Sequence, residues 1–260
     1  MKIASWNVNS LKVRLPQVLD WINLNQPDVL CLQETKQNNG NFPHDIFEQK
    51  GFFSYHNGQN TYNGVAIISN KELIDVQFDI SNFHDEQKRL ISGIYPNNEG
   101  PKFRVISAYI PNGQSLNSDK FEYKINWLKS FISSLQKKID GIENIITGDF
   151  NIAPTKLDCY DSKSWDGKIL VSPQEREYFD KLLNLGFIDT FREMNPNANE
   201  FSWWDYRIPF KRNLGMRIDH ILLSKTLLPF LKKAYIDKAT RTLERPSDHV
   251  PVVTELSLNP

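Results

Sequence analysis

The chain has 260 residues, in which 31 Lys and Arg balance 31 Asp and Glu, and 40% of the residues are apolar. This length and composition allow a sizeable core in one or two domains, which excludes general disorder, and the zero net charge excludes a uniformly basic DNA-coating protein. No apolar run approaches the ~18 residues of a membrane span, and the N-terminus lacks the apolar stretch of a signal peptide. We therefore expect a soluble, cytoplasmic protein without a membrane partner.

Strand-like runs recur along the whole chain, each short, rich in Val, Ile, Phe or Tyr, and bounded by turn-forming residues. They predict strands at Lys2–Val8, Val29–Gln33, Gly64–Ser69, Leu90–Tyr95, Phe103–Ile110, Asn144–Thr147, Arg217–Leu223 and Val252–Leu258. Several alternate apolar and polar residues, as strands with one buried face do. Cys31 lies in the second of these runs and is not part of a CxxC motif. We interpret it as a buried reduced thiol.

Amphipathic helices alternate with these strands. Apolar residues at helical spacing predict helices over 15–22 and 121–135. A third helix is predicted from Ser172, which with Glu175 forms a capping box, to Gly186, which ends the run. Mixed hairpin and crossover connections favour an α/β sandwich over a doubly wound parallel sheet. Because no linker or charge block interrupts the pattern, residues 1–260 are interpreted as a single domain.

Polar side chains gather where the predicted strands end. The six placements are Asn7 and Asn9, Gln33-Glu34, Tyr109 with Asn112, Asp149 with Asn151, Arg217-Ile218-Asp219-His220, and Ser247-Asp248-His249. Any single Asp or Asn among them has an ordinary explanation as a turn or cap residue. Burying an unpaired carboxylate, however, costs several kcal/mol, so six such placements predict convergence on one cluster.

The residue types in this cluster indicate phosphate-ester hydrolysis. Oxygen ligands suit Mg²⁺ or Mn²⁺, whereas zinc would require Cys or closely spaced His, and His44, His56 and His84 lack that spacing and are interpreted as surface residues. The sequence also lacks the glycine-rich phosphate loops of nucleotide-binding proteins and the GxSxG elbow. A divalent cation, an acid–base Asp, an Asp–His pair and Asn donors are what the attack of water on a phosphate ester requires.

Six motifs in order make the chain resemble a known family over residues 3–253. They are Trp6-Asn7-Val8-Asn9-Ser10-Leu11, Leu32-Gln33-Glu34-Thr35-Lys36, Tyr109-Ile110-Pro111-Asn112-Gly113, Gly148-Asp149-Phe150-Asn151-Ile152, Arg217-Ile218-Asp219-His220 and Ser247-Asp248-His249-Val250-Pro251. Together they resemble the exonuclease III type of apurinic/apyrimidinic endonuclease, within the endonuclease/exonuclease/phosphatase superfamily. The resemblance implies a four-layered α/β sandwich, in which two packed mixed β-sheets are flanked by helices.

The resemblance also implies roles for individual residues. Glu34 would be the principal Mg²⁺ ligand, and the candidate metal site comprises Asn7, Glu34, Asp149, Asn151 and Asp248. Asp149 would be the general acid or base, and Asn151 a donor to the phosphate. His249, oriented by Asp219, would contact the scissile phosphate or activate water. Tyr109 would hydrogen-bond the phosphate or serve as an acid.

An aromatic segment, Phe201-Ser202-Trp203-Trp204-Asp205-Tyr206-Arg207, favours DNA as the substrate within the superfamily. In relatives that cut at abasic sites, residues matching Trp203, Met216 and Ile218 form a pocket for a sugar that has lost its base, and such a sugar is easily flipped out because no pairing opposes it. Trp203 and Trp204 also have an ordinary explanation as core residues, and we expect one of the two to pack in the core. Asn112 and Arg207 are further candidates for substrate contacts.

These observations predict a Mg²⁺-dependent DNA-repair nuclease that acts on abasic sites and on 3′ ends of double-stranded DNA, as a monomer by analogy. The alternatives are another phosphoesterase of the superfamily, acting on RNA, inositol phosphates or phospholipid headgroups, and a non-catalytic DNA-binding module. Residues 203–245 contain ten Lys and Arg and four Asp and Glu, so this stretch carries +6 and the rest of the chain −6. We expect this stretch to form one basic face beside the sugar pocket.

Overall fold

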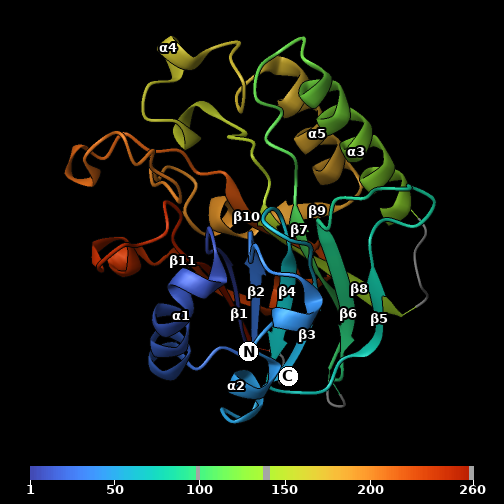
Figure 1. Ribbon diagram of the computed structural model, residues 1–260. Helices are drawn as coiled ribbons and strands as arrows, with labels where there is room; N and C mark the ends of the chain where they lie inside the picture. The colour runs from blue at the N-terminus through green and yellow to red at the C-terminus, as the bar shows by residue number, and fades with distance from the viewer. Residues whose placement is uncertain (98–99, 137–140, 258–260) are drawn as a thin grey trace.

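The computed structural model describes residues 1–97, 100–136 and 141–257 and contains two six-stranded mixed sheets (Figure 1). The first sheet has the order β11 (Leu231–Ile236), β12 (Val252–Leu256), β1 (Lys2–Asn7), β2 (Val29–Gln33), β4 (Val65–Ser69), β3 (Phe53–Asn57). The second has the order β5 (Ile74–Phe78), β6 (Leu90–Tyr95), β7 (Lys102–Tyr109), β8 (Ile142–Asp149), β10 (Asp219–Ser224), β9 (Phe187–Asp189).

All eight predicted strands are present, and β3, β5, β9 and β11 were not predicted. These four strands are the outermost strands of the two sheets. An edge strand is only partly covered and carries polar residues, so its sequence pattern is weak: β5 is mostly exposed, and two lysines interrupt β11. The predicted end of the last strand, Leu258, lies outside the described residues.

The helices of the described residues are α1 (Leu11–Asn25), α2 (His44–Glu48), α3 (Asp119–Leu135), α4 (Ser162–Trp165), α5 (Pro173–Asn184) and α6 (Thr190–Met194). Of these, α1, α2, α3 and α5 form the two outer layers. Short 3₁₀ turns span Asn39–Asn41, Lys156–Asp158, Phe210–Arg212, Lys225–Phe230 and Lys238–Thr242. The three predicted helices are confirmed as α1, α3 and α5, and the Ser172–Glu175 capping box starts α5 as expected.

Three apolar layers hold this arrangement together. Buried residues such as Ile3, Cys31 and Val105 fill the space between the two sheets. The outer face of the first sheet packs on α1 and α2, and the outer face of the second packs on α3 and α5, as Figure 1 shows at its lower left and upper right. The predicted four-layered α/β sandwich is therefore confirmed, and Cys31 is a buried free thiol. No helix among the described residues is long and apolar enough to span a membrane.

Candidate active site

Strand register brings the predicted residues together at one end of the sandwich. In the first sheet, β1 and β2 run parallel, so that Asn7 lies opposite Gln33, immediately before Glu34. In the second sheet, Tyr109 of β7 lies opposite Asp149 of β8, and Asp149 lies opposite Asp219 of β10. The ends of neighbouring strands thus bring together, at the same edge of the sandwich, side chains that are far apart in the sequence.

Unusual backbone at the strand ends shapes the site. Gly148 packs so closely on β7 that a Cβ there would lie 1.8 Å from the carbonyl oxygen of Ala108. Glu34 and Asn151 both have φ of 51°, in the left-handed region that residues other than glycine seldom adopt. Such strain persists only where surrounding contacts impose it, and it concentrates at functional sites.

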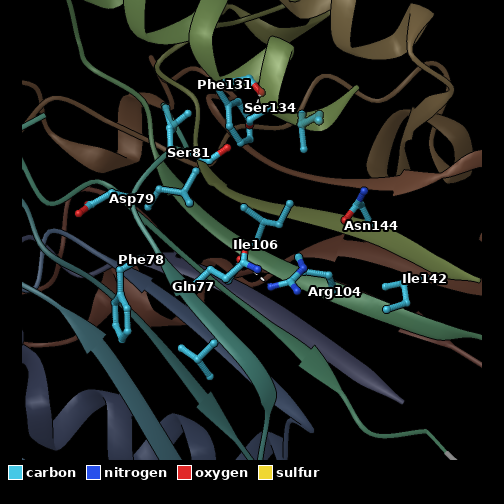
Figure 2. Close-up of a pocket in the computed structure, with 15 residues that line it drawn as sticks. Gln77, Phe78, Asp79, Ser81, Arg104, Ile106, Phe131, Ser134, Ile142 and Asn144 are labelled. Atoms are coloured by element: carbon cyan, nitrogen blue, oxygen red, sulfur yellow. Dashed lines mark hydrogen bonds between the residues drawn. The ribbon is translucent and has the colours of Figure 1, made fainter. Parts of the chain in front are cut away.

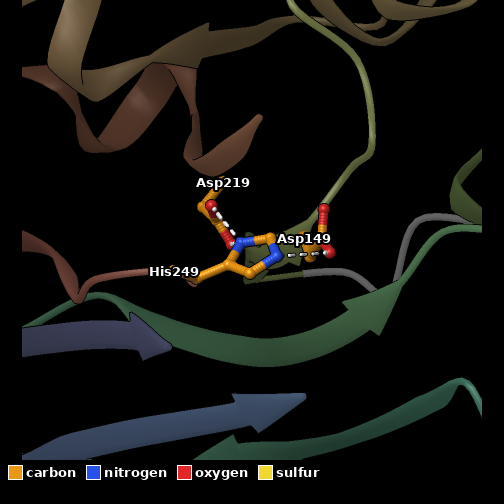
Figure 3. Close-up of side chains that lie close together, drawn as sticks. All are labelled: Asp149, Asp219 and His249. Carbon is orange, nitrogen blue, oxygen red and sulfur yellow. Dashed lines mark hydrogen bonds and ion pairs between the residues drawn. The ribbon is translucent and has the colours of Figure 1, made fainter. Parts of the chain in front are cut away.

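Asp149, Asp219 and His249 form a buried acid–histidine cluster (Figure 3). Both oxygens of Asp219 contact His249 Nδ1, at 2.9 and 3.1 Å, and His249 Nε2 lies 3.7 Å from Asp149 Oδ2. Ser202 donates its hydroxyl to Asp219 at 2.6 Å, which fixes that carboxylate. The predicted proximity of Asp219 and His249 is present, with the ring held between two acids.

The charges in this cluster shift both proton affinities. Burial raises the pKa of Asp149 to about 7, with Asp219 adding to the increase and His249 opposing it. Burial lowers the pKa of His249, but Asp219 and Asp149 outweigh it and raise the pKa to about 10. The two acids therefore favour the protonated imidazole, which makes His249 a donor to an anion, while burial makes Asp149 a stronger proton acceptor than an exposed carboxylate.

Glu34 and Asp149 share one amide. Asn7 Nδ2 donates to Glu34 Oε1 and to Asp149 Oδ2, both at 2.9 Å, while Asn7 Oδ1 accepts the backbone N–H of Asn9 at 3.0 Å. Asn7 thus presents nitrogen, rather than oxygen, to the predicted metal site. Burial opposes ionisation of Glu34, but Lys36, Asn7 and His249 lower its pKa below the ordinary value.

This donor set fits a hard divalent cation. Asp149, Asp219 and His249 each offer a ligand atom within 4.8 Å of the others. Both ring nitrogens of His249 already face carboxylates, however. The oxygens of Glu34 and Asp149, held 2.9 Å from the same Asn7 nitrogen, are consequently the donors best placed for a metal ion, in keeping with its preference for carboxylate oxygen.

Asp248 lies at the margin of the acidic group. Its Oδ1 accepts from Asn9 Nδ2 at 2.9 Å and its Oδ2 from Trp203 Nε1 at 3.0 Å. Lys36 bridges Asn9 and Glu34, with Nζ distances of 2.5 Å to Asn9 Oδ1 and 3.0 Å to Glu34 Oε2. The structure therefore connects Asp248 to Glu34 through two intervening side chains, and its role as a metal ligand stays a prediction.

Tyr109 and the two predicted asparagines line the side of the site formed by the second sheet. Burial and the Glu34 carboxylate raise the pKa of Tyr109 well above its usual value, so its hydroxyl stays protonated and able to donate. Asn112 Nδ2 donates to Asn151 Oδ1 at 2.9 Å, and Asn151 Nδ2 donates to the carbonyl of Ile110 at 3.0 Å. The backbone N–H of Asn151 donates to Asp149 Oδ1 at 2.9 Å, which locks the loop to the acid.

The three predicted sugar-pocket residues share one apolar cluster. Met216 and Ile218 are buried, Trp203 packs against them half-buried, and the backbone of Trp203 bridges those of Met216 and His249. Of the two tryptophans, Trp204 is the one buried in the core. Arg207, by contrast, points into solvent with 88% of its side chain exposed and pairs with Asp205. The structure thus groups the apolar candidates and leaves Arg207 apart from them.

The basic stretch does not lie on one face as a whole, and the part of the expectation that concerns a basic face beside the sugar pocket stays a prediction. Arg217 is buried in a second charged group, which we call the arginine cluster; its members are Asp158, Asp189, Arg192, Arg217 and His220. Lys232 and Lys233 follow Leu231 at the start of β11. Strand register places Lys233 opposite Glu255, which pairs in turn with Lys2, at the opposite end of the first sheet from Asn7. Within the basic stretch, Lys211 and Arg212 are exposed in the segment that follows Trp203 and Arg207.

His56 also departs from expectation. His44 and His84 are exposed as predicted, but His56 is buried, stacked on Phe42 with ring centroids 4.2 Å apart, and its Nε2 lies 2.8 Å from the hydroxyl of Thr35. The reason is that His56 belongs to β3, a strand that was not predicted. Through this contact His56 holds Thr35, the residue that follows Glu34.

Sequence reasoning missed Lys124, which is fully buried beneath Asn112 and Asn151 and contacts Glu175. Its buried position could have been inferred from the spacing, because Lys124 lies three residues after Phe121 and four before Leu128, on the apolar face of α3. Ser202 and Ser247 were also missed as supports, and no spacing distinguishes them from ordinary serines.

A cavity of about 530 Å³ lies away from this site, on the outer face of the second sheet (Figure 2). Arg104, Ile106, Phe131 and Ile142 line it. Ile142 begins β8, whereas Asp149 ends it, so the cavity and the acid–histidine cluster lie toward opposite ends of the same strand. The chemistry therefore does not belong to this cavity.

A family model described as endonuclease/exonuclease/phosphatase matches residues 4–249. The chain belongs to this family. Exodeoxyribonuclease III of Haemophilus influenzae is 38% identical over 98% of this chain and 99% of its own length. Among solved structures, the 3′ phosphatase NExo from Neisseria bound to a product DNA hairpin is 42% identical with a TM-score of 0.95, covering 99% of both chains. An AP endonuclease from Archaeoglobus fulgidus is 35% identical with a TM-score of 0.94, again covering 99% of both. The family resemblance and the expectation of a nuclease are thereby confirmed.

Proposed function

We propose that this chain is a Mg²⁺-dependent DNA-repair nuclease, with Mn²⁺ as a possible substitute, that hydrolyses phosphodiesters 5′ to abasic sites and trims 3′ ends of double-stranded DNA. The observation that carries this proposal is the acid–histidine cluster facing the Glu34–Asn7 pair, with the apolar cluster of Trp203 alongside. Relatives described as an AP endonuclease and a 3′ phosphatase support the two substrate classes.

The residues divide the hydrolytic step between them. Protonated His249, held by Asp219, donates to a phosphate oxygen, and Asp149 accepts a proton from the attacking water as the new P–O bond forms. The bond from phosphorus to the 3′ oxygen breaks, and the protonated Tyr109 hydroxyl supplies the proton that the leaving oxygen takes up. Mg²⁺ held by Glu34 and Asp149 would neutralise the negative charge that develops on the phosphate. Asn112 and Asn151 would orient that phosphate.

We further propose that residues 1–260 act as one catalytic domain, as a monomer in the cytoplasm. The support is that β1, β2, β7, β8 and β10 all contribute to the site, so both sheets of one chain are needed to assemble it. Light scattering combined with size-exclusion chromatography tests the monomer. We expect a molar mass equal to that of one chain, and a mass of two or more chains would contradict the proposal.

The test compares cleavage of an abasic duplex, a recessed 3′ end and a 3′-phosphate duplex in Mg²⁺, in Mn²⁺ and in EDTA. Cleavage in Mg²⁺ that EDTA abolishes is expected for all three. An inositol phosphate and an RNA tail serve as competing substrates, and faster hydrolysis of either would overturn the assignment to DNA.

Trp203→Ala tests the sugar pocket in the same assay. Loss of an aromatic surface beside the flipped sugar is expected to reduce abasic cleavage by about tenfold or more, with a smaller effect on the 3′ phosphate. Equal loss on both substrates would show that Trp203 acts by holding Asp248 rather than by selecting the sugar.

A further inference from the structure

A buried ion pair lies directly beneath the predicted phosphate-binding asparagines. Lys124 of α3 has no exposed surface, and its ammonium group contacts the Glu175 carboxylate of α5. The same nitrogen donates to the backbone carbonyl of Asn151 at 2.8 Å and to that of Asn112 at 3.2 Å. The three N–H donors of the ammonium therefore have three acceptors, two of which belong to loops of the site.

Glu175 is held just as completely. One carboxylate oxygen accepts from Lys124 and from the backbone N–H of Leu170 at 3.1 Å. The other accepts from the backbone N–H and the hydroxyl of Ser172, at 3.0 and 2.7 Å. A capping box needs only the contacts with Ser172, so the additional buried cation is not required to start α5.

Burial makes this pair costly as a purely structural device. Removing two charges from water carries a desolvation penalty that their attraction often fails to recover, and well-packed apolar residues of similar size commonly serve as well. Burial lowers the pKa of Lys124, while Glu175 opposes that change. A fully buried ion pair on the apolar face of α3 therefore requires an explanation beyond helix packing.

We propose, on the basis of the proposed nuclease function, that Lys124 is a positioning residue, anchored by Glu175, that fixes the loops of Asn112 and Asn151 against Asp149. Asn151 has a left-handed backbone, and its side-chain amide and backbone N–H bond Asn112, Ile110 and Asp149. Lys124 holds the two carbonyls that set where those amides point. Displacement of a positioned group by about 1 Å can reduce a rate by about 10²-fold.

The experiment uses Lys124→Met, Lys124→Arg and the double variant Lys124→Met/Glu175→Gln in the full chain, since Gln removes the charge of Glu175 and keeps an acceptor for the capping box. The double variant avoids an unpaired buried carboxylate, which keeps the protein folded if the single variant fails to fold. Thermal unfolding is measured for each, followed by kcat and KM on a 3′-phosphate duplex in Mg²⁺. Arg104→Met is the matched control, because Arg104 is a largely buried cation on β7 that pairs with Asp75 beside the cavity of Figure 2.

We expect kcat of the double variant to fall by about 10²-fold with little change in KM, at an unfolding temperature close to wild type. Lys124→Arg is expected to recover part of kcat, while Arg104→Met lowers stability and leaves kcat unchanged. A stable double variant with wild-type kcat would overturn the positioning role, as would a loss confined to KM. Failure of the proposed function is distinct, since the wild-type protein itself would then cleave no DNA.

Discussion

Two buried charged groups draw their residues alternately from the same part of the sequence but differ in charge balance. The acid–histidine cluster contains two carboxylates and one imidazole, with Glu34 nearby as a third acid. In the arginine cluster, Arg217 contacts Asp158 at 2.7 Å and both oxygens of Asp189 at 2.7 and 3.0 Å, and Arg192 also contacts Asp158 at 2.6 Å. One cluster has an excess of acid, and in the other every carboxylate meets a guanidinium.

The proton affinities follow this difference. In the arginine cluster, burial opposes ionisation, but Arg217 lowers the pKa of both Asp158 and Asp189 below the usual range. Burial and Arg217 lower the pKa of His220 to about 4, so this histidine is neutral, whereas His249 has a pKa of about 10. Burial of polar groups alone therefore does not mark a reactive site; an uncompensated excess of acid does.

The largest expected effect comes from Asp149→Asn. Loss of the group that accepts the proton of water should reduce kcat by between about 10²- and 10⁴-fold, while folding stability is unchanged or improved because a buried excess charge is removed. Single-turnover cleavage and thermal unfolding measure the two effects. Asp189→Asn is the comparison from the arginine cluster, and it should lower stability while kcat of the folded protein is retained. Equal effects of both variants on kcat would contradict the distinction.

Arg217→Met is expected to destabilise the protein most. It leaves Asp158 and Asp189 buried with too few cations, and breaking such a pair costs about 3–5 kcal/mol of unfolding free energy. Urea unfolding monitored by tryptophan fluorescence gives the change. A loss below about 1 kcal/mol would show that Arg192 and water compensate for the missing guanidinium.

Opposite pH dependences should separate the two histidines in metal-free buffer. The folded pKa of His249, about 10, exceeds the unfolded value of about 6.5, so its stabilisation is complete below pH 6.5 and is lost as the pH rises towards 10. The folded pKa of His220, about 4, lies below the unfolded value, so stability is lost as the pH falls from about 6.5 towards 4. Thermal unfolding across this range should show the upper slope flattened in His249→Gln and the lower slope flattened in His220→Gln. Flattening in the same window for both would be inconsistent with these charges.

The smallest expected effect concerns exposed charges outside both clusters. Lys211→Ala or Arg212→Ala should reduce the salt dependence of DNA binding by about one unit of log–log slope, if each contacts a phosphate. Lys232→Ala and Lys233→Ala, at the other end of the first sheet, should leave the slope unchanged. Binding of an abasic duplex to the Asp149→Asn protein at several salt concentrations provides the measurement. A larger effect of Lys232 or Lys233 would place the DNA elsewhere.

How far the sequence predicted the fold depended on burial. Central strands such as β2 and β8 were predicted because both faces are covered and their apolar pattern is strong. The edge strands β5 and β11 were missed because one side meets solvent and tolerates polar residues. The error on His56 has the same origin, since a histidine in an unrecognised strand has no predicted buried face.

The candidate site was predictable because the ends of neighbouring strands meet in space. Tyr109, Asp149 and Asp219 were each found at a strand end, and the register of β7, β8 and β10 sets them side by side. The buried partners were not predictable in this way. Lys124 had the spacing of an apolar position. Only the structure shows that Glu175 neutralises its charge there and that two backbone carbonyls accept its other N–H groups.

By itself, the sequence determined the order of the elements, the central strands and the chemistry available at their ends, because these depend on local pattern and residue type. Only the tertiary structure decided which acid meets which cation. Asn7 and Asp149 are 142 residues apart and Arg217 and Asp158 are 59 apart, yet both contacts are direct. Arg217 and Asp219 are almost adjacent in sequence and enter different clusters. Charge pairing in a low-dielectric interior depends on distance in space, so packing, rather than sequence proximity, separates the reactive cluster from the structural one.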